Sequence, residues 1–398
     1  MNIIDTENQY CAQNYLPLPI VLTRGRGVFV WDNQGKRYFD MMSAYSAVSH
    51  GHSHPRLVSA LTTQLTQLTI VSRAFYTDKL APFLQKACEL SGQDKALPMN
   101  TGAEAVETAI KAARKWAYKV KGVEQNKAEI ITCEGNFHGR TITIVGFSTE
   151  DQYKDGFGPF PEGFKNIPFG DAAALEAAIT PNTAAFLVEP IQGEGGIIVP
   201  PEGYLKQCAE ICKKHNVLLI CDEIQTGLGR TGKLFASDHD DVKPDGLVLG
   251  KALGGGMLAV SMFLSRKDVM DVFTPGDHGS TFGGNPLSSV VGLEALKLTV
   301  EKQLPNAADA LGTHFMQALK AMDTPLVKEV RGKGLLIGVE INSNIASARE
   351  VCEALMNKGL LTKETHETVV RFAPPLTMTK SELDNALTII KDVFLSFN

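Results

Sequence analysis

A lysine and an aspartate each stand at the end of an apolar segment, 29 residues apart in the chain. The segment Val217–Asp222 predicts a buried strand that ends in Asp222. Gly246–Gly250 predicts a second strand, which Lys251 follows directly. Because the carboxyl ends of neighbouring parallel strands meet at one edge of a sheet, we expect both side chains at that edge, where such sheets bind ligands.

Burial would change the chemistry of Lys251. Desolvation disfavours the ammonium form and lowers the pKa of a lysine, and a neutral amine can condense with a carbonyl group. Lys251 is therefore a candidate Schiff-base lysine. Three glycines, Gly254–Gly256, follow closely and would let backbone approach a flat ligand. Taken alone, the pattern is also typical of a lysine that extends its amine to solvent before a flexible loop.

A candidate phosphate site lies at the start of a predicted helix, Ala103–Lys119. The preceding residues, Asn100-Thr-Gly-Ala-Glu104, place the free backbone N–H groups of Gly102 and Ala103 at the positive end of this helix. Ordinary capping of the helix by its own first residues is an alternative that does not exclude phosphate binding.

These three features together match the needs of pyridoxal phosphate. An acid such as Asp222 would keep the pyridine nitrogen protonated, and the aldehyde would attach to Lys251. The helix end at Gly102 and Ala103 would hold the phosphate. A carboxylate at the end of an apolar strand also needs a cationic partner, which the pyridinium would supply.

The pattern of elements predicts an α/β fold. Between residues 80 and 290 helical and strand segments alternate, and the strands are rich in Val, Ile and Leu, as in a parallel sheet covered on both faces. The strands expected besides the two above are Glu129–Cys133, Ala184–Glu189 and Ala259–Ser265, and the expected helices include Pro201–His215 and Leu287–Thr299. A smaller α+β unit with the strand Leu335–Ile341 follows.

We therefore expect three parts. Residues 1–45 form an N-terminal segment, residues 46–290 a large cofactor-binding α/β domain, and residues 291–398 a small C-terminal α+β domain. A chain of 398 residues is long for one hydrophobic core, which also favours two domains.

Composition excludes several classes of function. The net charge of −5, without a run of Lys and Arg, argues against nucleic acid as a partner. No apolar run approaches the length of about 18 residues that a membrane span needs. The polar N-terminus lacks the features of a signal peptide. Seven cysteines without a C-x-x-C pair favour reduced thiols in the cytoplasm. The segment His50-Gly-His-Ser-His54 has no carboxylate or cysteine at ligand spacing, so no metal site is predicted.

Two nucleotide-binding patterns in Gly227–Lys233 are rejected. The glycines Gly227, Gly229 and Gly232 match the dinucleotide fingerprint, but four residues separate the strand from the first glycine and no amphipathic helix follows. The same segment resembles a phosphate loop, yet Leu234 stands where the magnesium-binding hydroxyl is needed. A nucleotide-dependent oxidoreductase is therefore disfavoured, as is a cofactor-free binding protein, because Lys251 and Asp222 are both present.

Over almost its whole length the chain resembles the class III, fold type I, pyridoxal-phosphate-dependent aminotransferases, and within them the ornithine aminotransferases. The resemblance rests on these strings: Asn14-Tyr-Leu-Pro-Leu-Pro19, Pro98-Met-Asn-Thr-Gly102, Asn136-Phe-His-Gly-Arg-Thr141, Val188-Glu-Pro-Ile-Gln-Gly-Glu194, Asp222-Glu-Ile-Gln-Thr-Gly227, Gly250-Lys-Ala-Leu253, His278-Gly-Ser-Thr281 and Arg371-Phe-Ala-Pro-Pro375. It implies a large domain with a mainly parallel seven-stranded sheet covered by helices, plus the smaller C-terminal domain.

The resemblance implies a cofactor site and a homodimer. Lys251 is the expected Schiff-base lysine and proton carrier, and Asp222 the partner of the ring nitrogen. The remaining expected cofactor contacts are Gln225 at the phenolic oxygen, Phe137 stacked on the ring, Gly102 and Ala103 at the phosphate, and Ser280 and Thr281 at the phosphate from a second subunit. Two subunits that share active sites in this way form an obligate homodimer.

The resemblance also implies the substrates. Tyr15 and Arg140 are expected to hold the α-amino and α-carboxylate groups of L-ornithine, which turns its δ-amine towards the cofactor, while Tyr45 narrows the pocket. Arg371 is expected to bind 2-oxoglutarate bidentately, and Glu194 to cover Arg371 when ornithine is bound. A surface ion pair is the plain alternative for Glu194 and Arg371.

The expected reaction is transfer of the δ-amino group of ornithine to 2-oxoglutarate. Acetylornithine and 4-aminobutyrate aminotransferases of the same class are the alternatives. His138 and Gly195 differ from the residues found in some family members, and both flank substrate contacts. These two positions bear on the fine specificity of the pocket.

Overall fold

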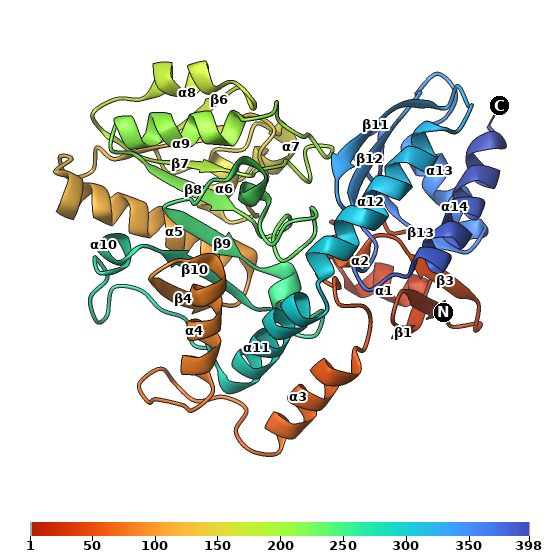
Figure 1. The fold of residues 1–398 in the computed structure, drawn as a ribbon, viewed down its shortest axis with the longest axis horizontal. Coiled ribbons are helices and arrows are strands. Elements are labelled where there is room, and N and C mark those ends of the chain that lie inside the picture. Colours follow the sequence, from red (N-terminus) through yellow and green to blue (C-terminus); the bar gives the residue numbers. More distant parts are fainter. Residues whose placement is uncertain (1, 398) are drawn as a thin grey trace.

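A seven-stranded sheet forms the centre of the larger part of the protein (Figure 1). The computed structural model describes residues 2–397. From one edge to the other the strands are β4 (Lys95–Met99), β10 (Ser261–Ser265), β9 (Gly246–Leu249), β8 (Leu218–Asp222), β7 (Thr183–Val188), β5 (Glu129–Cys133) and β6 (Phe164–Ile167). Strands β9, β8, β7, β5 and β6 pair in parallel, whereas β10 pairs antiparallel with both of its neighbours. The expected α/β fold with a mainly parallel seven-stranded sheet is confirmed.

Helices cover both faces of this sheet. One face packs against α5 and α10, and the other against α4, α8, α9 and α11. The elements of this part outside the sheet are α3 (Pro55–Leu65), α4 (Leu80–Ser91), α5 (Gly102–Trp116), η1 (Ala117–Lys121), α6 (Ile142–Gly146), α7 (Asp151–Lys154), α8 (Ala172–Ala178), α9 (Tyr204–Lys214), η2 (Ala236–Asp240), η3 (Lys251–Gly254), α10 (Lys267–Met270) and α11 (Pro286–Glu301). Every residue of β7, β8 and β9 is buried, which explains their uninterrupted apolar sequences.

Two strands of this sheet escape sequence-based prediction. Strand β4 contains Pro98, and β6 has the sequence Phe-Lys-Asn-Ile. Both are edge strands, which have a neighbouring strand on one side only and are partly exposed to water. Their sequences therefore show neither an apolar run nor a clear alternation of apolar and polar residues. The antiparallel direction of β10 is also invisible in the sequence, because an apolar strand looks the same in both directions.

The smaller part contains two four-stranded sheets and three long helices. One sheet has the order β1 (Leu22–Arg26), β2 (Phe29–Asp32), β3 (Arg37–Asp40) and β13 (Leu360–Leu361). The other has the order β11 (Val327–Lys333), β12 (Leu336–Ile341), β15 (Val369–Phe372) and β14 (Lys363–Thr365). The helices are α12 (Leu304–Lys320), α13 (Ala348–Asn357) and α14 (Lys380–Leu395), while α1 (Ile3–Tyr10) and α2 (Ser43–Ser46) belong to the N-terminal segment.

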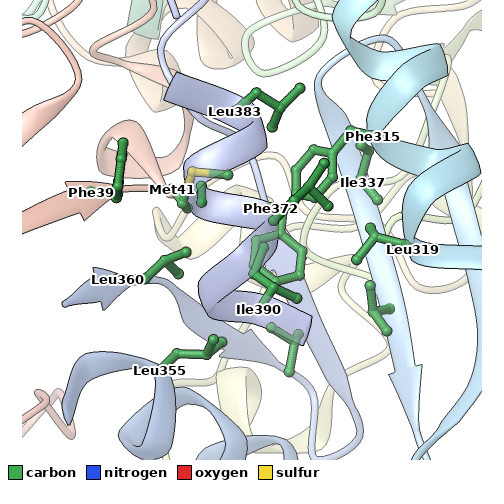
Figure 2. Close-up of a cluster of buried hydrophobic side chains, with 14 of the residues drawn as sticks. Phe39, Met41, Phe315, Leu319, Ile337, Leu355, Leu360, Phe372, Leu383 and Ile390 are labelled. Atoms are coloured by element: carbon green, nitrogen blue, oxygen red, sulfur yellow. The ribbon is translucent and has the colours of Figure 1, made fainter. Parts of the chain in front are cut away.

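The N-terminal segment shares the core of the smaller part (Figure 2). Phe39 and Met41 pack in one cluster with residues of the C-terminal third, among them Phe315, Phe372 and Leu360. Strand β3 also pairs in parallel with β13. The hairpin β2–β3 therefore contributes to the core of the smaller part.

The predicted boundary between residues 290 and 291 falls inside helix α11. This helix packs against α3, α4 and η3, and its residues Val291, Ala295 and Leu298 form a cluster with Leu57. We propose that the division between the two parts lies after Glu301, where α11 ends and α12 begins with Leu304, and that the first 40 or so residues belong with the small part.

The seven cysteines are free thiols. Among residues 2–397, no helix is long and apolar enough to cross a membrane, and no group of three metal-ligating side chains is gathered.

Candidate active site

A pocket opens at the carboxyl ends of the parallel strands, as expected from the strand pattern. Asp222, the last residue of β8, and Lys251, which follows β9, both line it. Gly102 and Ala103, at the first turn of α5, line the same pocket. Three segments that are far apart in the chain thus bring a lysine, a carboxylate and a helix N-terminus together.

Lys251 is the strained and desolvated group of the pocket. Its backbone has a φ of +43°, a left-handed conformation that is unfavourable for a lysine and common at functional sites. Burial lowers the pKa of its amine to about 8, although the negative charge of Glu194 opposes this shift. A substantial fraction of Lys251 is therefore neutral near neutral pH, as attack on a carbonyl group requires.

Asp222 is paired with His138, a residue to which the sequence assigned no role. The Nδ1 atom of His138 lies 2.7 Å from Oδ2 of Asp222, and both side chains are buried. Burial by itself lowers the pKa of His138, but the hydrogen bond and negative charge of Asp222 outweigh it, so the pKa is raised above its ordinary value. The hydrogen bond to His138 fixes the orientation of the Asp222 carboxylate in the pocket.

Glu189 is a further pocket residue that the sequence reasoning missed. Its carboxylate accepts hydrogen bonds from the backbone N–H groups of Phe137, at 3.0 Å, and Gly193, at 3.3 Å. Burial raises the pKa of Glu189 to about 7, while the nearby charge of His138 lowers it. Glu189 ends the apolar run of β7, just as Asp222 ends β8. An acidic residue directly after an apolar run is the pattern that identified Asp222, and the same pattern would have identified Glu189.

The start of helix α5 is shaped for a close-fitting ligand. Thr101 and Glu104 form a capping box, so the capping alternative holds. The capping leaves other N–H groups of the first turn available. A Cβ atom on Gly102 would lie only 2.9 Å from Cδ1 of Ile224. A side chain at Gly102 would therefore require the Ile224 side chain to shift.

Glu194 and Arg371 form the ion pair expected from the resemblance. Both guanidinium nitrogens of Arg371 donate to the Glu194 carboxylate, at 2.6 and 3.0 Å, and the guanidinium lies 5.0 Å from the ring centre of Tyr45. Arg371 is only 1% exposed, which excludes an ordinary surface ion pair. Burial would raise the pKa of Glu194, but Arg371 dominates and holds it at about 2. Gln225 donates a further hydrogen bond of 3.1 Å to Glu194.

The other expected substrate residues, Arg140 and Tyr15, do not themselves line the pocket. The guanidinium of Arg140 stacks over Tyr153 at 3.5 Å and lies 5.4 Å from the ring centre of Phe137. Phe137 itself lines the pocket. Tyr15 is 74% exposed on the N-terminal segment, and the pKa of Tyr45 is raised chiefly by burial.

Ser280 and Thr281 do not line the pocket of their own chain. The Ser280 hydroxyl accepts a hydrogen bond of 2.7 Å from the side chain of Asn100, and Thr281 is exposed. Of the expected cofactor residues, these two alone lie outside the pocket that the described chain forms.

The residues present fit pyridoxal phosphate. The pocket combines a desolvated amine, a buried carboxylate backed by a histidine, and a helix N-terminus, which suit the aldehyde, the ring nitrogen and the phosphate respectively. Within residues 2–397, the buried Oε1 atom of Gln225 has no hydrogen-bond partner, whereas its Nε2 atom donates to Glu194. Gly193 leaves room for this amide, since a Cβ atom there would overlap Oε1 of Gln225.

Comparison with known families decides the class. The model of the family "Aminotransferase class-III" matches residues 10–394. The chain is a class-III aminotransferase. The cofactor of this class-III aminotransferase is therefore pyridoxal 5′-phosphate, bound on a fold type I scaffold.

Known relatives cover this class-III aminotransferase from end to end. It is 60% identical over 392 residues to "Ornithine aminotransferase 2" of Staphylococcus aureus strain Mu50, covering 98% of each chain. Among solved structures, the ornithine aminotransferase from Toxoplasma gondii, described with pyridoxal phosphate at partial occupancy in its active site, superposes with a TM-score of 0.97. The two sequences are 47% identical, and the match covers 99% of this chain and 94% of the other.

A structure named for a different substrate is also similar. The acetylornithine aminotransferase from Elizabethkingia anophelis superposes with a TM-score of 0.90, at 50% identity over 99% of this chain and 98% of the other. Overall similarity alone therefore does not separate the two substrates, and the pocket residues must do so.

Proposed function

We propose that the protein transfers the δ-amino group of L-ornithine to 2-oxoglutarate, giving glutamate and glutamate 5-semialdehyde, which cyclises to a pyrroline carboxylate. The observation that carries the proposal is the buried, bidentate pair of Glu194 and Arg371 beside Tyr45. One pocket must accept first a diamino acid and then a dicarboxylate, so one of its positive charges has to be switchable. The 60% identity to a protein named ornithine aminotransferase supports the same substrate.

We assign the chemical step to Lys251 and Asp222. Pyridoxal phosphate, when bound, supplies a carbonyl group that captures amines and a ring that withdraws electrons from the substrate carbon. The Nζ atom of Lys251 accepts the proton from that carbon and returns it to the cofactor side. Asp222, oriented by His138, would pair with the protonated ring nitrogen. Phe137 would stack on the ring, Gln225 would bond its phenolic oxygen, and Gly102 and Ala103 would hold its phosphate.

Substrate orientation is assigned to a second set of residues. Tyr15 and Arg140 hold the α-amino and α-carboxylate groups of ornithine, so that the δ-nitrogen reaches the cofactor. During this half of the reaction Glu194 neutralises Arg371. In the second half Glu194 moves away, and Arg371 binds a carboxylate of 2-oxoglutarate with both of its terminal nitrogens.

We further propose a homodimer with shared active sites. Ser280 and Thr281 lie outside the pocket of their own chain and would complete the phosphate site of a second copy. Large apolar side chains in this region are exposed, with Phe75 at 67%, Tyr76 at 107% and Phe282 at 57%. Such a cluster on the surface of one chain favours burial against a second chain. The free thiols of all seven cysteines support a cytoplasmic location.

An amine-donor comparison tests the proposed substrate. The purified enzyme is supplied with pyridoxal phosphate and 2-oxoglutarate, and then with L-ornithine, N-acetylornithine or 4-aminobutyrate. The proposal expects the highest kcat/KM with L-ornithine, together with formation of the pyrroline product. A higher kcat/KM with N-acetylornithine would replace the proposal by the acetylornithine activity. Light scattering of the same preparation measures the mass of the assembly, and a monomer would refute the shared site.

A further inference from the structure

Arg230 is a fully buried cation outside the proposed catalytic residues. It lies on the loop that follows β8 and Gln225, with 0% of its surface exposed. Its Nη1 atom donates to the carbonyl oxygens of Leu335, at 3.0 Å, and Pro374, at 2.6 Å. Its Nη2 atom donates to the hydroxyl groups of Ser49, at 2.8 Å, and Ser43, at 3.5 Å. One guanidinium thus joins three segments, each of which lies more than 100 residues from Arg230 in the chain.

The environment of Arg230 does not resemble an ordinary ion pair. No carboxylate of the described chain lies within ion-pair distance of it, and burial lowers the pKa of its guanidinium to about 9, with Asp40 opposing the shift from farther away. A buried charge without a carboxylate partner is costly. An arginine at this position can bond several acceptors at once, because its N–H donors have a fixed planar geometry. Neither lysine nor an apolar residue supplies such a set of donors.

The first segment held by Arg230 carries Tyr45 in a strained turn. Residues 43–46 all have left-handed backbones, with φ values of 42°, 48°, 57° and 74°, although none is glycine. Such a run is unfavourable for L-residues and persists only where the surroundings enforce it. Here Asp40 accepts the N–H of Ser43 at 2.8 Å, the Ser49 hydroxyl donates to the Ser46 carbonyl at 2.9 Å, and Arg230 binds the hydroxyls of Ser43 and Ser49.

The second segment held by Arg230 follows Arg371 directly. Pro374, whose carbonyl Arg230 binds, is three residues beyond Arg371. The two segments are also tied to each other, because the N–H of Ala373 donates to the Met41 carbonyl at 2.7 Å and the Ser43 hydroxyl donates to the Ala373 carbonyl. Arg230 therefore sits where the backbones that carry Tyr45 and Arg371 meet.

The loop around Arg230 is in close contact with the small part of the protein. The Leu335 N–H donates to the Arg230 carbonyl at 3.0 Å, so side chain and backbone of Arg230 both pair with Leu335. Gly334 has a φ of +54°, and a Cβ atom on it would overlap the backbone of Thr231 at 2.4 Å. This packing leaves little freedom for rearrangement if the guanidinium is lost.

We propose that Arg230 is a positioning residue for the dicarboxylate end of the substrate pocket: it sets the strained Tyr45 turn against the Arg371 strand. The inference rests on the proposed function, since it assigns Tyr45 and Arg371 to substrate binding. Tyr45 and Arg371 face each other across 5.0 Å, and Arg371 binds the second substrate only when its guanidinium is held in place. Loss of Arg230 therefore acts on the binding of 2-oxoglutarate more than on the binding of pyridoxal phosphate.

The first test is steady-state kinetics of the Arg230→Lys holoenzyme. The lysine retains the positive charge, but its single amine cannot bond both the two backbone carbonyls and the two serine hydroxyls that the guanidinium bonds. We expect the KM for 2-oxoglutarate to rise on the order of tenfold, with a smaller change in the KM for ornithine and unchanged affinity for pyridoxal phosphate. Unchanged KM values for both substrates would overturn the inference. A wild-type enzyme that is inactive with ornithine would instead refute the proposed function, so the two failures are distinct.

Two further variants keep the inference testable if Arg230→Lys does not fold. Ser49→Ala removes one acceptor of the guanidinium and one contact of the strained turn, and we expect the same selective rise in KM on a smaller scale. Ser265→Ala is the matched control, because it removes a buried hydroxyl that bonds the Asp245 carbonyl at the far end of β10. Equal effects of the two substitutions on the KM for 2-oxoglutarate would overturn the positioning role.

A double-mutant cycle shows whether Arg230 acts through Tyr45. Tyr45→Ala removes the ring that faces Arg371. If Arg230 positions this ring, Arg230→Lys (or Ser49→Ala) raises the KM for 2-oxoglutarate much less in the Tyr45→Ala background than in the wild type. The same fold-change in both backgrounds would show that Arg230 acts independently of Tyr45 and would refute the inference.

Discussion

The carboxylate of Glu194 receives two hydrogen bonds from Arg371, at 2.6 and 3.0 Å, in a part of the pocket where Arg371 is almost completely buried. In this state the guanidinium is neutralised, and a dicarboxylate would have to displace Glu194 in order to bind. The pair therefore offers a direct way to change the choice between the two amino groups of a substrate.

Glu194→Gln should shift the enzyme from δ-amino towards α-amino transfer. The glutamine keeps the size of the side chain but leaves Arg371 charged and open to α-carboxylates. We expect the ratio of α- to δ-transfer to rise about tenfold, the change that corresponds to about 1.4 kcal/mol. Product analysis with ornithine measures the ratio, and Glu194→Asp, which retains the charge, serves as the control. A constant ratio would contradict the switch.

Lys251→Ala should abolish turnover without preventing cofactor binding. The phosphate and ring contacts at Gly102, Asp222 and Phe137 remain, whereas the amine that carries the proton is lost. We expect kcat to fall by about a thousandfold or more. Borohydride treatment followed by mass spectrometry should label wild-type Lys251 and leave the variant unlabelled. Labelling of another lysine in the wild type would refute the assignment.

Covalent attachment of pyridoxal phosphate to the apoprotein should depend on pH with a midpoint near 8. Burial lowers the pKa of Lys251 to about 8, and only the neutral amine attacks the aldehyde. The rate of attachment is therefore expected to rise as the pH is raised through 8 and then to level off. Stopped-flow absorbance measures it. A midpoint above 10, as for an exposed lysine, would contradict the desolvation of Lys251.

Glu189→Gln should change how the stability of the apoprotein depends on pH. The pKa of Glu189 is raised from 4.5 to about 7 by burial, so the folded protein holds this proton between these values and the unfolded chain does not. The contribution of Glu189 to the free energy of unfolding is thus fully present below pH 4.5 and is lost as the pH rises through 7. We expect the variant to gain stability relative to the wild type over this interval, measured by urea unfolding. A constant difference would contradict the raised pKa.

A heterodimer of two inactive variants should recover activity if the active sites are shared. One subunit carries Lys251→Ala, and the other carries Ser280→Ala and Thr281→Ala. If the two hydroxyls serve the opposite pocket, one of the two sites is intact, and about half of the wild-type activity is expected. Differently tagged subunits allow the heterodimer to be purified. If Ser280 and Thr281 serve their own chain, both sites are defective and the heterodimer is inactive.

Much of the site is visible in the sequence because its parts are local. A strand that ends in an acid, a strand that ends before a lysine, and a helix start with a glycine are each contained in a few residues. The fold class then follows, since strands buried on both faces need apolar side chains throughout. Edge strands β4 and β6 lack this requirement, and the sequence therefore conceals them.

Other residues have no local sign of their role. His138 is one histidine among nine until the fold places its Nδ1 atom beside Asp222, 84 residues away. Arg230 lies within a glycine pattern that resembles a nucleotide-binding loop, and only the structure shows its guanidinium between the Tyr45 turn and the chain after Arg371. The sequence likewise does not show that the N-terminal segment packs with the smaller part. Only the structure shows Phe39 in one core cluster with Phe372.

By itself, the sequence predicted the α/β class and the pairing of Glu194 with Arg371, and it led to the proposal that Lys251 and Asp222 carry the pyridoxal phosphate chemistry. Strands and helices are predictable because the periodicity of buried residues is a property of neighbouring positions. The functional residues are predictable because the motifs of a known family occur in this sequence. The tertiary structure alone decided which buried groups support those residues, namely His138 and Arg230. The contacts of these two residues join positions that are 84 to 187 apart, and such distances in the chain leave no pattern in the local sequence.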